Sequence, residues 1–348
     1  MRARRAVTGP CVQEDGDMEL QILRQLGRNV VYASQLQGDT STWSVSPVWT
    51  NDVDDGGQHL LTLHQDFVDY TTKTRCLLFD YCPFGDLFSH VSSRARNDGL
   101  PKGLPIDMAR SCFLQIASAV RFLHTRNVAH RDLSLENVLL DSFRRCRLAD
   151  FGLASAVGSR CSGARVGKML YMAPEVFARS PYRPDAANVE MSYNGLQADI
   201  WSLGVLLFIL VTGIPPFERA GEVDARFRLV SKPGGSVREL LRVWDKENQV
   251  PSDLRTLLDW MLRVDPRQRP TAEQVCGHEW LLESDTLREL AEAKAVPRWS
   301  THGEKRPSAE PEEEEDGENL EPQKMARVVN QSDKPGAWSS NKRLKRME

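Results

Sequence analysis

The sequence predicts an α+β fold with two lobes, a small β-rich lobe followed by a larger helical one. Two neighbouring segments, "HLLTLHQDFVDY" at 59–70 and "KTRCLLFDYC" at 73–82, have the composition of paired strands with a turn between them. A long amphipathic segment at 106–127 and a nearly continuous apolar one at 197–213 have the length and pattern of helices. The second lobe is therefore expected to be mostly helical, with two short strands within 128–155.

The remaining elements follow from shorter patterns. "DMELQILRQL" at 17–26 has apolar residues at helical spacing and predicts a helix that ends near Gly27. Further helices are predicted at 86–96, 237–244, 252–262 and 271–281. We divide the chain into a partial β-rich lobe at 1–80 with a polar insertion at 28–58, a helical lobe at 81–283, and a charged tail at 284–348. The tail cannot bury a core and is expected to be disordered.

Composition narrows the class of protein. A formal net charge of -3 gives no preference for nucleic acid or membrane, and the oligomeric state is not indicated. The seven cysteines form no C-x-x-C pair, which indicates a reducing compartment, and the N-terminus lacks the apolar core of a signal peptide. We expect a cytoplasmic protein. The basic end "NKRLKRME" leaves a nuclear address open. The apolar run at 200–217 is expected to be a buried helix, not a membrane span.

The stretch "HRDLSLENVLLDSFRRCRLADFG" at 130–152 contains an acid, an amide and a second acid: Asp132, Asn137 and Asp150. Such a set can hold magnesium and a triphosphate, which makes phosphoryl transfer a candidate reaction. That reaction needs positioning and charge neutralisation more than covalent chemistry. Asn137 offers an uncharged oxygen to a hard cation that also has phosphate ligands, and Asp150 offers a carboxylate. The alternative is that both acids are turn or capping residues.

Residues 60–282 resemble a eukaryotic protein kinase of the serine/threonine type, because several motifs follow one another in order. After the catalytic-loop and "DFG" motifs come "YMAPE" at 171–175, "DIWSLG" at 199–204 and "DPRQRPT" at 265–271. The resemblance implies a bilobal kinase fold, ATP and Mg²⁺ as cofactors, and a protein substrate. It makes Asp132 the base that accepts the substrate hydroxyl proton, and Asn137 and Asp150 the metal ligands. Arg269 would pair with Glu175, and Asp199 would accept backbone hydrogen bonds from the catalytic loop.

The resemblance also assigns a nucleotide site and two supporting residues. In "CLLFDYCPFGDLF" Phe79 would lie beside the adenine. The backbone carbonyl of Asp80 and the backbone N–H of Cys82 would face the edge of the adenine. The residues counted with the nucleotide site are Phe79, Asp80, Cys82, Asp86 near the ribose, Glu136, and Leu139 beneath the base. His130 is expected to pack beneath the "DFG" turn. Arg131 would either clamp a phosphate on Ser155, Ser159 or Ser162, or only anchor that segment.

The first part of the sequence departs from the family. "MELQILRQL" resembles the end of the regulatory helix, with Glu19 as its ion-pairing acid, or Glu19 is an ordinary surface residue. The chain has no lysine before Lys73 and no G-x-G-x-x-G, so the phosphate-covering hairpin and its lysine strand are missing. Either the chain is an incomplete form of a longer kinase, which we favour, or it is a catalytically impaired pseudokinase that binds partners. If the chain is complete as printed, we expect feeble or absent kinase activity.

The catalytic loop has one further departure. Serine/threonine kinases usually have a lysine two residues after the catalytic aspartate and a threonine in "GT..Y" before "APE". This chain has Ser134 and Lys168 at those places. Our hypothesis is that the two partners have exchanged sides. Lys168 would reach the γ-phosphate and Asp132 while Ser134 supplies the short hydrogen bond. The alternative is two unrelated substitutions with Lys168 in solvent.

Overall fold

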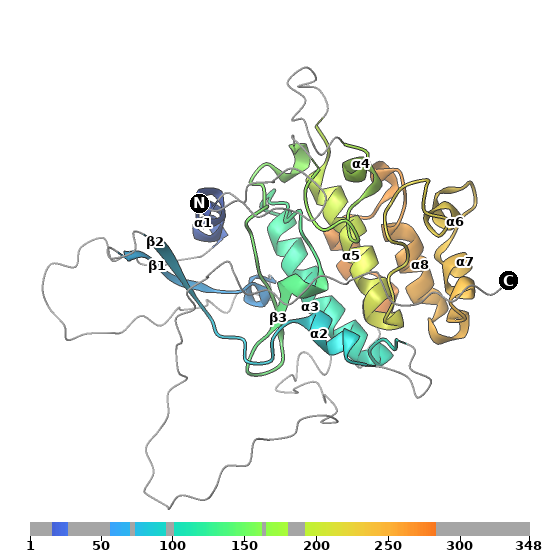
Figure 1. Cartoon of the computed structure of the whole chain (residues 1–348), viewed down its shortest axis with the longest axis horizontal. Helices are drawn as coiled ribbons and strands as arrows, with labels where there is room; N and C mark the ends of the chain where they lie inside the picture. Colours follow the sequence, from blue (N-terminus) through green and yellow to red (C-terminus); the bar gives the residue numbers. More distant parts are fainter. Residues whose placement is uncertain are drawn as a thin grey trace, which may run out of the picture.

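The computed structural model describes residues 16–26, 56–69, 74–94, 101–161, 165–179 and 192–282. A two-stranded hairpin and one helix lie at one side, and the large helices pack together at the other (Figure 1). The predicted α+β fold is therefore present. Nearly all of the insertion at 28–58 and the whole tail at 284–348 lie outside the described residues.

The small lobe consists of α1 (Gly16–Leu26) and the antiparallel strands β1 (Leu63–Asp69) and β2 (Thr74–Phe79). Figure 1 shows α1 beside the hairpin. The Arg24 guanidinium donates to both Asp66 carboxylate oxygens at 3.0 and 2.9 Å, and Arg75 donates to Asp17 at 2.7 Å. These pairs join the helix to the hairpin, but exposed ion pairs contribute little free energy. Its apolar face is buried: Leu20, Ile22, Leu23 and Leu26.

The connection into β1 packs on the helical lobe. The short turn η1 (Gly57–His59) follows Gly56, whose φ of 82° places it in the left-handed region. A Cβ on Gly56 would lie 2.0 Å from the carbonyl oxygen of Ser118, so only glycine fits against that helix backbone. The Leu61 N–H then donates to the carbonyl of Leu148 at 2.8 Å. The last three residues of the predicted insertion are thus part of the packed fold.

Two long helices form the centre of the large lobe. α3 (Ile106–His124) packs against α5 (Gly195–Thr212) and buries an apolar stripe at helical spacing. The Asn194 side chain caps α5 by accepting the Gln197 N–H at 3.2 Å, and Gly213 ends it at φ 75°. α5 is the one described helix apolar and long enough to cross a membrane, and 83% of that stretch is buried inside the fold. It is a core helix, as predicted.

Shorter helices complete this lobe: α2 (Leu87–Ser92), α4 (Pro174–Phe177), α6 (Phe227–Ser231), α7 (Val237–Val243) and α8 (Ser252–Met261). Three further turns are η3 (Gly158–Arg160), η4 (Glu247–Gln249) and η5 (Pro266–Gln268). The single helix predicted at 271–281 was wrong, because two helices occupy it, α9 (Ala272–Cys276) and α10 (Glu279–Leu282). A Thr271–Gln274 capping box starts α9 and Gly277 ends it.

A second antiparallel hairpin carries the candidate site. After the turn η2 (Leu135–Asn137), β3 (Val138–Leu140) pairs with β4 (Cys146–Leu148). Asp141 holds the connecting loop, because its carboxylate accepts the N–H groups of Phe143 at 2.8 Å and Arg145 at 2.9 Å. It also accepts a guanidinium bond from Arg147 at 2.9 Å. The ladder places Asn137, just before β3, next to the residues just after β4.

Candidate active site

The catalytic loop is held by a buried carboxylate on the central helix. Asp199 is only 1% exposed and accepts the backbone N–H groups of His130 and Arg131, each at 2.8 Å. His124 Nε2 donates to the same carboxylate at 3.1 Å. Arg131 has a φ of 66°, which a non-glycine residue adopts only when the surroundings enforce it. Asp199 provides that constraint and so fixes the direction in which Asp132 leaves the loop.

His130 connects this loop to the "DFG" turn. Its side chain is fully buried, and its Nε2–H donates to the Ala149 carbonyl at 3.1 Å while Nδ1 faces the Asp132 N–H at 3.4 Å. Its ring packs on Phe151 with centroids 5.1 Å apart. Burial lowers the pKa of His130, outweighing the nearby carboxylates, so the imidazole is neutral. His130 therefore lies beneath the turn and supports the loop from within the core.

Asp132 is surrounded by donors. Lys168 approaches it twice: the backbone N–H donates to Oδ1 at 2.9 Å, and Nζ donates to Oδ2 at 2.9 Å. Asn137 Nδ2 donates to the Asp132 carbonyl at 2.8 Å and to Oδ2 at 2.9 Å. Lys168 Nζ also donates to Ser134 Oγ at 2.8 Å and Asn137 Oδ1 at 3.1 Å. The predicted residues Asp132, Ser134, Asn137 and Lys168 thus form one cluster.

Gly167 makes the double approach of Lys168 possible. Its φ is 90°, and a Cβ at this position would lie 2.6 Å from the Arg131 carbonyl oxygen and 3.6 Å from Asp132 Oδ1. The segment carrying Lys168 therefore runs directly against the catalytic loop. The sequence reasoning missed this residue, although a glycine immediately before the lysine was the available signal.

Asn137 and Asp150 lie at the same end of the β3–β4 hairpin. The Ala149 N–H donates to the Asn137 carbonyl at 2.9 Å, which brings the start of the "DFG" turn against Asn137. Asp150 has a φ of 68°. The Asn137 amide nitrogen donates to Asp132, so the Oδ1 atom of Asn137 is the one that can bind a metal ion. An amide oxygen and a carboxylate are the donors that Mg²⁺ prefers, so the residues fit this ion.

The residues predicted for the nucleotide lie along one border between the lobes. Phe79 ends β2 opposite Leu63, and the Asp80 N–H donates to the Thr62 carbonyl at 3.2 Å. Asp86 forms an isolated bridge with Leu139, so the residue predicted near the ribose and the residue predicted beneath the base are neighbours. The Asp86 carboxylate also caps α2, accepting the Ser89 N–H at 2.7 Å.

At this border two side chains have shifted pKa values, and a third has a buried oxygen without a hydrogen-bond partner among the described residues. Burial raises the pKa of Asp80, but the hydrogen bond and charge of His64, 2.6 Å away, outweigh it and the net pKa is lowered. Burial raises the pKa of the Cys82 thiol to about 11, so it stays protonated. Glu136 Oε2 is buried without a hydrogen-bond partner in the described part of the chain.

The far end of the segment after the "DFG" turn is fixed by a buried ion pair. Arg269 donates to both Glu175 oxygens at 2.8 Å, and its side chain is fully buried. It also donates to the carbonyls of Arg263 at 2.7 Å and Gln197 at 2.8 Å. The bidentate geometry suits a guanidinium and not an ammonium. The pair joins the segment to the loop before α9.

The comparisons with known proteins show the family of this chain. The protein kinase domain family matches residues 56–281. The chain belongs to the protein kinase family. NUAK family SNF1-like kinase 2 from Homo sapiens is 34% identical over 224 residues, which cover 64% of this chain and 31% of that protein. NUAK family SNF1-like kinase 1 from Homo sapiens is 32% identical over 224 residues, which cover 64% of this chain and 29% of that protein.

A third relative is the "Probable serine/threonine-protein kinase fhkD" of Dictyostelium discoideum. It is 31% identical over 210 residues, which cover 59% of this chain and 26% of that relative's length. The aligned part thus spans about a third or less of each relative's length. The predicted kinase family and its bilobal α+β fold are confirmed.

The remaining predicted residues are Glu19, Arg131 and the three candidate phosphorylated serines. Glu19 lies in the first turn of α1. Arg131 Nε donates to the Tyr193 hydroxyl at 2.9 Å, and its guanidinium also lies over that ring. Ser155 pairs through its backbone with Ala129. Ser159 is described as well, whereas Ser162 lies outside the described residues. The choice between phosphate clamp and anchor for Arg131 stays a prediction.

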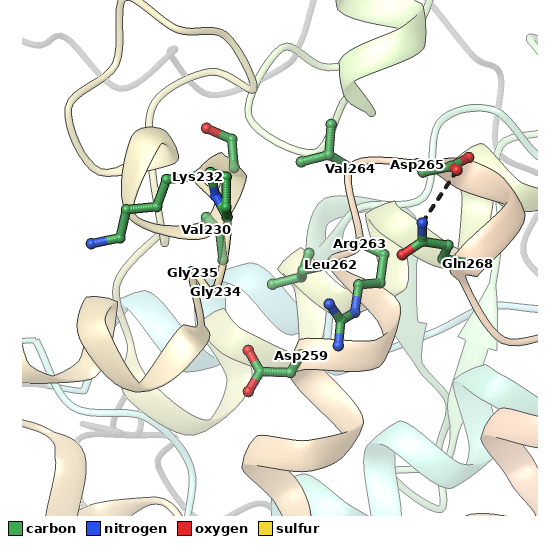
Figure 2. Close-up of a pocket in the computed structure, with 12 residues that line it drawn as sticks. Val230, Lys232, Gly234, Gly235, Asp259, Leu262, Arg263, Val264, Asp265 and Gln268 are labelled. Atoms are coloured by element: carbon green, nitrogen blue, oxygen red, sulfur yellow. Dashed lines mark hydrogen bonds between the residues drawn. The ribbon is translucent and has the colours of Figure 1, made fainter.

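One cavity lies away from the catalytic residues. It has a volume of about 250 Å³ and lies between the turn after α6 and the end of α8 (Figure 2). Lys232, Asp259 and Arg263 line it, and Gln268 donates to Asp265 at 3.4 Å at its edge. None of its lining residues belongs to the predicted site.

Proposed function

We propose that this chain is a serine/threonine protein kinase that transfers the γ-phosphoryl group of ATP to hydroxyl groups of a protein substrate. The observation that carries the proposal is the cluster in which Asp132, Asn137 and Lys168 meet. The similarity to proteins named as kinases supports it, including one named as a serine/threonine-protein kinase. The catalytic loop reads "LSLEN", without the alanine-arginine pattern of tyrosine kinases.

The proposed step uses Asp132 as the base. The substrate hydroxyl oxygen forms a bond to the γ-phosphorus while the bond from that phosphorus to the bridging oxygen of ADP breaks. The electron pair of the broken bond stays on ADP, and the hydroxyl proton passes to the Asp132 carboxylate and then to solvent. Asp132 is held in place by two donors from Lys168 and one side-chain amide, so it orients the hydroxyl without moving itself.

Protein kinases as a family use ATP and Mg²⁺, and the donor set here suits that ion. Asn137 Oδ1 and the Asp150 carboxylate would hold Mg²⁺, which neutralises charge on the phosphates when bound. Phe79, Asp80, Cys82 and Leu139 would surround the adenine. We propose a cytoplasmic protein with a protein substrate and without nucleic-acid or membrane partners.

A second candidate, a catalytically impaired pseudokinase or interaction module, rests on one feature of the sequence alone. The chain contains no lysine before Lys73 and no G-x-G-x-x-G, so no residue matches the lysine that holds the α- and β-phosphates. For the chain as printed we therefore expect slow turnover. Slow turnover that depends on Asp132 distinguishes the kinase from the interaction module, which would show none.

The test is a phosphotransfer assay with Mg²⁺, radiolabelled ATP and a mixed protein substrate, followed by phosphoamino-acid analysis. We expect label on serine and threonine that falls about 100-fold or more in Asp132→Asn, because the base and its orienting contacts are lost together. Equal label in the wild type and Asp132→Asn would refute the proposed function. Label mainly on tyrosine would refute the substrate class alone.

A further inference from the structure

Lys168 lies at the centre of a group of oxygen atoms that belong to the catalytic loop. Its Nζ bonds to Asp132 Oδ2, Ser134 Oγ and Asn137 Oδ1 at 2.9, 2.8 and 3.1 Å. An ammonium group has three N–H donors, so these acceptors use all of them. The lysine side chain is nevertheless 32% exposed, so it is not sealed inside the fold.

The same contacts determine which oxygen of Asp132 can act on a substrate. Each carboxylate oxygen accepts about two hydrogen bonds. Oδ2 already accepts from Lys168 Nζ and Asn137 Nδ2, whereas Oδ1 accepts only the Lys168 N–H among the described contacts. Oδ1 therefore retains a lone pair for the substrate hydroxyl. Lys168 and Asn137 together fill the other sites and orient the base.

The third contact of Lys168 shows where its charge would act. Asn137 Oδ1 accepts a bond from Nζ here, and it is also the atom suited to Mg²⁺. When that oxygen binds a cation instead, one N–H of Lys168 is released. The released N–H would then be available to a phosphate oxygen, because the phosphates accompany the cation and the hydroxyl accompanies Asp132. With both groups bound, we expect the ammonium to lie between them.

We propose that Lys168 supplies the positive charge that contacts the transferred phosphoryl group, and that it does so from the segment between Asp150 and Glu175. This inference rests on the proposed kinase function. Lys168 stays protonated throughout and contributes charge and a hydrogen bond only. Ser134, fully buried with its short side chain, leaves the space that the ammonium occupies. The site thus gains its cation only when this segment lies against the catalytic loop.

A purely structural role for Lys168 would give a different result in nucleotide binding. A lysine that only ties the segment to the loop would affect ADP and ATP alike. A lysine that contacts the γ-phosphoryl group affects only a nucleotide that carries it. The probes are therefore Mg²⁺ with the non-hydrolysable analogue AMP-PNP, and Mg²⁺ with ADP, each titrated into the full chain by calorimetry. The variants are Lys168→Met and, as a matched control at an exposed lysine, Lys102→Met.

We expect Lys168→Met to weaken AMP-PNP binding about tenfold or more, as for a lost charge-assisted bond, and to leave ADP binding within about twofold. Lys102→Met should bind both like the wild type. Equal weakening of both nucleotides, or no weakening of either, would overturn the inference while leaving the kinase function in place. A wild-type chain that binds neither nucleotide would overturn the proposed function itself, and the inference with it.

Discussion

Gly167→Ala tests how closely the segment must approach the catalytic loop. The new Cβ would lie 2.6 Å from the Arg131 carbonyl oxygen, whereas ordinary contact begins at 3.4 Å, so the backbones must separate by about 0.8 Å (3.4 minus 2.6). The same movement stretches the 2.9 Å bond from the Lys168 N–H to Asp132 beyond hydrogen-bonding range. The positive φ of 90° adds strain of roughly 1–2 kcal/mol.

The expected result is a large loss of activity with a small loss of stability. A displacement of about 1 Å at a reacting group can cost on the order of 100-fold in rate, so kcat should fall about that much. The melting temperature should fall by only about 3–6 °C, since one local turn is strained. Gly234→Ala is the control, because Gly234 also has a positive φ, of 72°, but a Cβ there meets nothing within 4 Å.

The assay is the Mg²⁺-dependent phosphotransfer rate of the two variants beside thermal unfolding. The reasoning fails if Gly167→Ala keeps kcat within about threefold of the wild type. It also fails if Gly234→Ala loses as much activity, because strain without a clash would then explain the effect.

Two further predictions concern stability. Arg269→Lys cannot reproduce the bidentate bond to Glu175 in a fully buried site, so it should cost about 2–4 kcal/mol in urea unfolding; an unchanged midpoint would contradict this. Burial raises the pKa of Asp141, but the Arg145 N–H and the Arg147 guanidinium outweigh it, leaving the pKa below 3.8. The stabilisation is therefore present above pH 3.8 and lost as pH falls through the lower folded-state pKa. Asp141→Asn should lower the melting temperature by about 3–6 °C at neutral pH and by much less in acid; an equal loss at both would refute it.

Much of the large lobe could be predicted because its patterns are long. The helix expected at 106–127 appears as α3 (Ile106–His124), and the one expected at 197–213 appears as α5 (Gly195–Thr212). An apolar pattern that extends over many residues predicts a helix with little competition from other elements. The helix expected at 271–281 failed because Gly277 and a second start at Glu279 divide it, and such short-range capping competes with a weak pattern.

The site could be predicted as a set of residues but not as a set of contacts. Motif spacing indicated Asp132, Asn137 and Asp150, and the sequence alone raised the Ser134–Lys168 exchange. The structure adds that Lys168 binds Asp132 through its backbone as well, and that His124 shares Asp199 with the catalytic loop. These contacts join residues far apart in sequence through a backbone N–H group and a partly buried imidazole, so no local sequence pattern predicts them.

The pairing of α1 with β1 and β2 had no sequence signal either. Arg24 meets Asp66, and Asp17 meets Arg75, across long sequence separations. Exposed charges of both signs are common on any helix, so their partners are decided by how the elements dock.

The most direct test of the account is the phosphotransfer rate of the double variant Ser134→Lys/Lys168→Thr, compared with each single variant. Lys168→Thr removes the cation and Ser134→Lys places a second ammonium beside the first, so each should lose about 100-fold in kcat. The double variant returns one cation to the same cluster and should recover at least tenfold over the better single variant. Single variants as active as the wild type, or a double variant no better than either, would contradict the account.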